Sequence, residues 1–292
     1  MNNIEAFKAK YPKQTIDVLG KPFSFRYYKN NNSDITLVLL VGGIGLSDLM
    51  AMHFEAFAQK YSVITLDYSP DYPDMQTLTD AIAELLKKLN VKAVLVGQSL
   101  GGFIAQIIAK NHPDVVEGLV LSNTGTLSSE LDEEGRKHFD DMLKAIDKSL
   151  FIMKLLPFGI VKKMIKKGVL NKTQGQLSEQ ETEIMAEFCD EMVQSLTKKY
   201  EIHMTLLLKD LQNHQNMERI YFARYAGKVL LILSSDDDTF NDSIRQTLIS
   251  VMPSPKVVTD ITGGHLALLL KFEKYEQAIV SFIDNAHMNK GE

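Results

Sequence analysis

Residues 91–110 read VKAVLVGQSLGGFIAQIIAK, and this stretch decides the fold. Its first six residues form an apolar run that predicts a buried strand, and residues 100–111 have the length and apolar character of a helix. The turn between them, GQSLGG, has the pattern G-x-S-x-G. A reversal from strand to helix within so few residues strains the backbone of Ser99, and glycines at positions 97 and 101 relieve the crowding.

In this setting the hydroxyl of Ser99 is expected to project above the edge of a sheet, beside the free N–H groups that begin the helix. That position suits a nucleophile. The simpler interpretation is a glycine-rich turn that only joins a strand to a helix. The directly adjoining strand and helix favour the nucleophile.

The same alternation of strand and helix continues on both sides of this turn. Alternating elements of this kind predict βαβ units and a parallel sheet. Strands are expected at residues 14–19, 22–28, 35–43, 62–66, 91–96, 116–121, 228–233 and 256–261. Helices are expected at residues 46–60, 77–89, 100–111, 241–252 and 266–286.

Between residues 126 and 226 the alternation stops and only helical patterns remain. Four helices are expected there, with a kink or break at Pro157 and Gly159 in the second. Their ranges are residues 133–149, 150–167, 178–197 and 199–212. A helical block of about 100 residues is therefore inserted into an α/β domain.

Three motifs resemble those of the α/β-hydrolase superfamily: GQSLGG at 97–102, VGGIG at 41–45 and TGGH at 262–265. The order of strands and helices is similar over nearly the whole chain. The resemblance implies an α/β-hydrolase fold, with a mostly parallel twisted sheet flanked by helices. It also implies a core domain of residues 1–125 and 227–292, and an inserted helical cap of residues 126–226.

His265 is the predicted general base. A serine hydroxyl needs a base within hydrogen-bond reach, and the base needs an orienting group. The superfamily order is Ser, then Asp or Glu, then His, and His265 follows the last predicted strand at the same sheet edge as Ser99. Solvated or packing roles are favoured for the other downstream histidines, His112, His138, His203, His214 and His287.

The acid is expected among the three aspartates at positions 236–238, which follow the strand at 228–233. The resemblance to a family pattern G-x-x-D, with Ser234 in place of the glycine, implies Asp237. A frame shifted by one implies Asp238 as the alternative acid. A third interpretation is that the triplet only caps the following helix. Residues 122–124 read SNT, so the loop after the preceding strand offers no carboxylate.

Two backbone donors are expected to stabilise the negative charge that develops on the substrate oxygen. The resemblance implies the N–H of Leu100 and one from the VGGIG loop, where Gly43 is favoured and Ile44 is the alternative. Val41 replaces the histidine that usually orders this loop in the family. The competing interpretation is a glycine turn that binds nothing.

Composition narrows the class of protein. The chain has a net charge of −5, which argues against the basic surface that a general nucleic-acid binder needs. The single cysteine, Cys189, cannot form an internal disulfide, and the polar N-terminus does not resemble a signal peptide. No apolar run approaches the ~18 residues of a bilayer span, so we expect a cytoplasmic protein without stable membrane insertion. Four lysines at 162, 163, 166 and 167 favour a solvated face, with contact to a membrane surface as the alternative.

These features predict a serine hydrolase that cleaves a small, largely apolar ester or related acyl substrate through an acyl-enzyme. The chemistry needs no metal or organic cofactor, and the expected partner is a small-molecule substrate. Two alternatives are a proline-type aminopeptidase and a catalytically weak interaction protein of the maspardin-like type. SLGGFIAQ at 99–106 and residues 151–170 of the insert support the latter resemblance. A carbon–carbon bond hydrolase and any oligomeric state stay open.

Overall fold

The structure of the protein is a computed structural model that describes residues 4–288 apart from 174, 176 and 178. An eight-stranded sheet lies at its centre, in the order β1-β2-β4-β3-β5-β6-β7-β8. β2 pairs antiparallel with both β1 and β4, and the other pairs are parallel. The strands are β1 (Gln14–Val18), β2 (Lys21–Tyr28), β3 (Thr36–Leu40), β4 (Ser62–Leu66), β5 (Ala93–Gln98), β6 (Val116–Ser122), β7 (Val229–Ile232) and β8 (Lys256–Val258).

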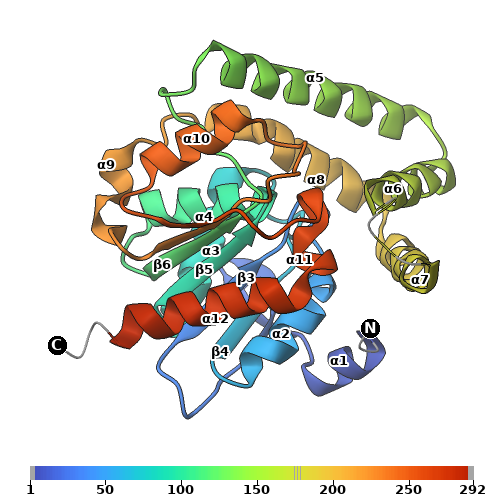
Figure 1. The fold of residues 1–292 in the computed structure, drawn as a ribbon. Coiled ribbons are helices and arrows are strands. Elements are labelled where there is room, and N and C mark those ends of the chain that lie inside the picture. The colour runs from blue at the N-terminus through green and yellow to red at the C-terminus, as the bar shows by residue number, and fades with distance from the viewer. Residues whose placement is uncertain (1–3, 174, 176, 178, 289–292) are drawn as a thin grey trace.

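Helices cover both faces of the sheet, which explains its apolar strands. Every residue of β3, β4 and β5 is buried, as expected for a parallel sheet with two covered faces. In Figure 1, α2 and α12 pack together on one face, and α3 and α4 lie behind the sheet. The helices before residue 133 and after residue 210 are α1 (Ile4–Lys10), α2 (Ala51–Ala58), α3 (Met75–Lys88), α4 (Leu100–Asn111), α9 (Arg219–Phe222), α10 (Asp242–Val251), α11 (Ala267–Leu270) and α12 (Phe272–Met288).

The parallel strands β3, β5, β6, β7 and β8 end at one edge of the sheet. The loops that follow these neighbouring strands therefore lie side by side. This edge carries the predicted nucleophile, the aspartate triplet and the TGGH motif.

A helical insert of four helices, α5–α8, is connected between β6 and β7. It lies outside the sheet layers, beyond the edge where the loops meet (Figure 1). Its helices are α5 (Glu133–Leu155), α6 (Phe158–Thr173), α7 (Glu179–Ser195) and α8 (Lys198–Asp210). None of the helices in the described part of the chain has both the length and the apolar character that crossing a bilayer requires.

The predicted boundary between the first two insert helices, at residues 149–150, is wrong. α5 continues for 23 residues to Leu155. The break predicted at Pro157 is present, because proline cannot donate the helical hydrogen bond and holds Leu156 in an extended conformation, with ψ of 150°. A continuous helix therefore reaches from the sheet edge to the far end of the insert.

Other elements also differ from the prediction. The N-terminal helix α1 was not expected, and its Phe7 is buried against the core. The final helix, predicted as one piece, is divided into a short turn, α11 and α12, with a break at Lys271. The last strand ends at Val258, three residues before the predicted end.

Candidate active site

The turn at Ser99 has the strained geometry that its sequence predicts. Ser99 has φ of 52° and ψ of −118°, in a region that L-residues rarely occupy. A side chain at position 97 would collide with the backbone of Gly101, and one at position 101 would collide with the carbonyl of Leu40. Glycine at both positions therefore lets β5 and α4 meet closely enough to present the hydroxyl at the sheet edge.

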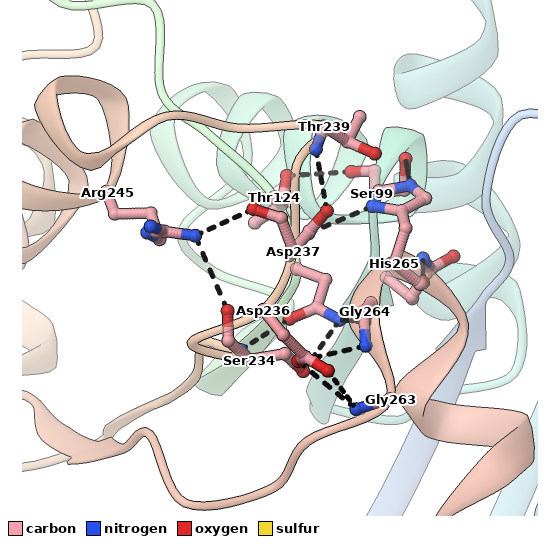
Figure 2. Close-up of polar contacts among 12 residues, drawn as sticks. Ser99, Thr124, Ser234, Asp236, Asp237, Thr239, Arg245, Gly263, Gly264 and His265 are labelled. Atoms are coloured by element: carbon pink, nitrogen blue, oxygen red, sulfur yellow. Dashed lines mark hydrogen bonds and ion pairs between the residues drawn. The ribbon is translucent and has the colours of Figure 1, made fainter. Parts of the chain in front are cut away.

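Ser99, His265 and Asp237 form one chain of hydrogen bonds (Figure 2). Nε2 of His265 lies 2.9 Å from Oγ of Ser99, and its Nδ1 lies 3.0 Å from Oδ2 of Asp237. The second contact fixes the tautomer, since a carboxylate accepts from Nδ1–H and leaves Nε2 free to accept the serine proton. These three residues come from the loops after β5, β7 and β8.

Asp237 remains a carboxylate because of its partners. Burial alone raises the pKa of this carboxyl, but the hydrogen bond and charge of His265, with the donors of Thr239, outweigh burial and hold the pKa below its usual value. The backbone N–H of Thr239 donates to Oδ1 at 2.8 Å. An ionised, nearly buried carboxylate therefore faces the imidazole.

The other two aspartates of the triplet have different surroundings. Asp238, the alternative acid, is exposed, and His265 contacts Asp237 instead. The helix-capping interpretation is not what the structure has, because Asn241 caps α10 by accepting from the N–H of Ile244. The carboxylate of Asp236 accepts from the N–H groups of Gly263 and Gly264 at 2.9–3.1 Å.

The sequence did not reveal the roles of Asp236 and Asn123 at this site. Asn123 follows β6, has φ of 40° and is buried. Its Nδ2 donates to the carbonyl of Gly264 at 2.7 Å, and its Oδ1 accepts from the N–H of Ser234 at 2.9 Å. Asn123 thus connects the loop of the acid to the loop of the histidine. The only sequence indication was its place directly after a strand at this edge.

The loop at residues 41–45 is held by two tyrosines. The hydroxyl of Tyr68 donates to the carbonyl of Val41 at 2.7 Å, and that of Tyr200 donates to the carbonyl of Gly45 at 2.6 Å. Tyr200 lies on α8, so the insert touches the loop directly. Gly45 has φ of 72°, and a side chain there would collide with Tyr200. These contacts order a loop that has Val41 where the family has histidine.

Gly43 and Leu100, the two predicted donors, come from the loops after β3 and β5. Leu100 is the first residue of α4, so its N–H has no acceptor within the helix. Gly43 lines the same cavity as Ser99. Gln98 connects the turn of Ser99 to the loop of His265, because its Nε2 donates to the carbonyl of His265 at 3.1 Å.

An apolar cavity of about 430 Å³ opens onto Ser99 and His265. The sheet-edge loops form its floor, and all four helices of the insert contribute to its walls. The wall residues from the insert are Met142, Ala145, Ile146, Val169, Met192 and Leu208. A pocket of this size and character suits a small ligand with an apolar part.

The remaining candidates lie away from this site or are chemically unsuited to it. His112 contacts Asp80 at 2.6 Å, and His214 contacts Asp210 at 3.3 Å. His138 of α5 contacts the carbonyl of Thr239 at 2.9 Å and so anchors the insert to the loop of the acid. Burial raises the pKa of the Cys189 thiol to about 11, which disfavours a thiolate.

Comparisons with known proteins agree with this architecture. A family model described as the alpha/beta hydrolase fold matches residues 35–272. RutD of Caulobacter vibrioides, a candidate carbamate hydrolase, is 24% identical over 261 residues, covering 86% of this chain and 91% of that protein. RutD of Serratia proteamaculans is 34% identical over 98 residues, and NDRG2 of Mus musculus 33% over 79 residues. These two matches cover 30% and 27% of this chain, which spans 37% and 21% of the lengths of those relatives.

Two solved structures share the fold. The enol-lactonase from Burkholderia xenovorans LB400 has a TM-score of 0.72 at 17% identity, covering 93% of this chain and 100% of that one. A thermophilic esterase from Thermogutta terrifontis has a TM-score of 0.69 at 16% identity, covering 94% and 99%. At such low identity the likeness concerns the fold alone.

Proposed function

Because the chain belongs to the alpha/beta hydrolase fold family, we propose that it is a serine hydrolase that cleaves a small, largely apolar ester or related acyl compound. The observation that carries the proposal is the continuous hydrogen-bond chain from Ser99 through His265 to Asp237. A buried carboxylate, an oriented imidazole and a hydroxyl in this order are the parts that nucleophilic acyl transfer needs.

The proposed reaction begins when Oγ of Ser99 attacks the substrate carbonyl and Nε2 of His265 accepts its proton. Asp237 stabilises the imidazolium that forms. The N–H groups of Leu100 and Gly43 donate to the oxyanion of the tetrahedral intermediate. The intermediate collapses, His265 protonates the departing alcohol, and an acyl-enzyme is left on Ser99. Water then attacks the acyl carbon while His265 accepts a proton from it. The bond to Oγ of Ser99 breaks, the imidazolium returns the proton to Oγ, and the acid is released.

The cavity supports the proposed substrate class. Its walls are apolar side chains from both the sheet-edge loops and the insert, which favours an acyl or alkyl group over a charged one. We therefore assign residues 126–226 as a cap that shapes the substrate site, and residues 1–125 and 227–292 as the core domain that performs the chemistry. This chemistry is complete without a metal or an organic cofactor.

The cavity lining also separates the ester from the aminopeptidase alternative. An aminopeptidase has to bind a charged α-ammonium group, for which a carboxylate is the natural partner. None of the described residues that line the cavity is Asp or Glu. An uncharged ester therefore fits the site better than a peptide with a free N-terminus.

Hydrolysis of p-nitrophenyl esters of increasing acyl length, measured by stopped flow, tests the proposal. We expect a burst of p-nitrophenol equal to the enzyme concentration for the wild type, and none for Ser99→Ala. The exposed Ser129→Ala is the matched control and keeps the burst. Prolyl p-nitroanilide should not be cleaved. A folded wild type with neither burst nor turnover on any ester would favour the interaction protein.

A further inference from the structure

One segment of the insert has a charge opposite to that of the rest of the chain. Residues 148–178 contain seven lysines and no Asp, Glu or Arg. Since the chain has a net charge of −5, the remaining residues carry a net charge of −12. This segment comprises the last two turns of α5, the turn at Pro157 and all of α6.

Large apolar side chains are exposed within the same segment. Phe151 and Leu155, one turn apart on α5, are 65% and 64% exposed. Ile160 and Met164, one turn apart on α6, are 47% and 48% exposed. The two pairs lie in sequence on either side of the turn at residues 156–157. Figure 1 shows that α5 and α6 lie in the insert, outside the layers of the sheet and its covering helices. We refer to these four residues with Lys163 and Lys167 as the α5–α6 corner.

The four lysines of α6 at positions 162, 163, 166 and 167 divide into an inner and an outer set. Nζ of Lys166 lies 2.6 Å from Asp190 of α7, and Nζ of Lys162 lies over the ring of Phe158 and donates to the carbonyl of Gln194. These two hold α6 against α7. Lys163 and Lys167 are exposed, and in the part of the chain that the structure describes neither has a carboxylate partner. Their charges are therefore available to an external ligand.

We propose that the α5–α6 corner binds the surface of an anionic lipid bilayer. Apolar side chains next to lysines suit the boundary between acyl chains and headgroups, where the apolar tips insert and the long lysine stems reach back to lipid phosphates. A negatively charged surface attracts the lysines of this corner and repels the rest of the chain, which has a net negative charge, so the corner is expected to face the bilayer. A protein interface would be expected to favour Arg over Lys, whereas the segment contains seven lysines and no arginine.

The corner belongs to the same helices that enclose the cavity. α5 contributes Met142, Ala145 and Ile146 to the cavity wall, and α6 contributes Val169. Binding at the corner would thus hold the cavity wall next to the lipid. The binding proposal itself depends only on the exposed residues and charges, and not on the reaction at Ser99.

Co-sedimentation of the full-length protein with vesicles tests the proposal. One set of vesicles contains phosphatidylcholine alone, and the other contains equal parts of phosphatidylcholine and phosphatidylglycerol. We expect binding to the anionic vesicles only, and a loss of binding at high salt because added ions screen the lysine charges. Absence of binding to anionic vesicles, or equal binding to both kinds, overturns the proposal.

Paired variants locate the contact. Lys163→Ala with Lys167→Ala should weaken binding about 30-fold, since each lysine near an anionic surface contributes roughly a five-fold factor. Phe151→Ser with Leu155→Ser should weaken it at least as much. The matched controls lie elsewhere on the surface: Ile220→Ser, at an exposed isoleucine of α9, and Lys29→Ala with Lys92→Ala. Corner variants that bind like these controls would refute the assignment.

Three further measurements separate the possible outcomes. Circular dichroism and hydrolysis of a soluble ester without vesicles should be the same for every variant and the wild type, so that misfolding and catalytic failure are separated from loss of lipid binding. Poly-glutamate serves as the competing anionic ligand. Binding of the wild type to poly-glutamate but not to anionic vesicles would mean an acidic protein partner and would exclude the lipid surface.

Discussion

The loops at the sheet edge and the helical insert hold their residues in place by different means. At the edge, the strained backbone of Ser99 and the hydrogen bonds of Asp236 and Asn123 hold the loops that carry the nucleophile, the acid and the histidine. The insert lines the cavity with apolar side chains and reaches the edge through a few polar contacts, such as Tyr200 to Gly45. Polar contacts are directional whereas apolar packing is not. The edge is therefore suited to chemistry, and the insert to the choice of substrate.

The largest expected effect comes from the acid at the edge. Asp237→Asn should lower kcat for ester hydrolysis about 10⁴-fold, because the amide no longer selects the tautomer of His265 or stabilises its cation. Asp238→Asn, at an exposed position, should change kcat less than about threefold. Steady-state kinetics on one ester compares the two variants. Equal losses, or a larger loss for Asp238→Asn, would reverse the assignment of the acid.

A buried histidine beneath the edge should make stability depend on pH. Burial lowers the pKa of His53 to about 4, and its Nε2 lies 3.1 Å from the carbonyl of Leu268 in α11. An unfolded histidine has a pKa near 6.5, so the folded state binds fewer protons between pH 6.5 and 4. The stability from neutral His53 is present above pH 6.5 and is lost as the pH falls toward 4, by about 3 kcal/mol in the free energy of unfolding.

Urea unfolding at several pH values measures this effect. His53→Gln can still donate to the carbonyl of Leu268 but does not titrate, so its free energy of unfolding should vary less over this range. Parallel curves for wild type and variant would mean that other groups cause the pH dependence.

The contact between insert and edge should have a smaller effect on catalysis. Tyr200→Phe removes one hydrogen bond to the loop of Gly43, worth about 1.4 kcal/mol, so kcat should fall about tenfold while KM changes little. Tyr221→Phe is the control, because this tyrosine is exposed on α9. A rise in KM with unchanged kcat would show that Tyr200 serves substrate binding and not the order of the loop.

The smallest effect is expected within the insert itself. Ile146→Ala removes part of the cavity wall and so enlarges the cavity, and it changes no residue of the sheet-edge loops. It should shift kcat/KM toward a longer acyl chain by about fivefold, because one or two methylene groups in an apolar pocket discriminate only weakly. Ile220→Ala, outside the cavity, should leave the preference unchanged. A loss of turnover on all esters alike would contradict the division between chemistry at the edge and selection in the insert.

The two regions also differ in how far the sequence predicts them. The strand–turn–helix at residues 91–110 was predictable because sterics leave few ways to place G-x-S-x-G between a strand and a helix. In the insert, the break at Pro157 was predicted correctly, but the helix boundary predicted at residues 149–150 was wrong. No residue there stops a helix, so α5 continues to Leu155. The roles of Asp236 and Asn123 were not predicted because they depend on loops that are distant in sequence and adjacent only after the sheet forms.

Labelling with a fluorophosphonate probe, with the modified residue identified by mass spectrometry, tests the central claim most directly. The account predicts that the folded wild type is labelled on Ser99. It predicts no labelling of Ser99→Ala and strongly slowed labelling of His265→Ala, because the hydroxyl then lacks its base. A folded wild type that stays unlabelled, or a label on another residue, would contradict the account.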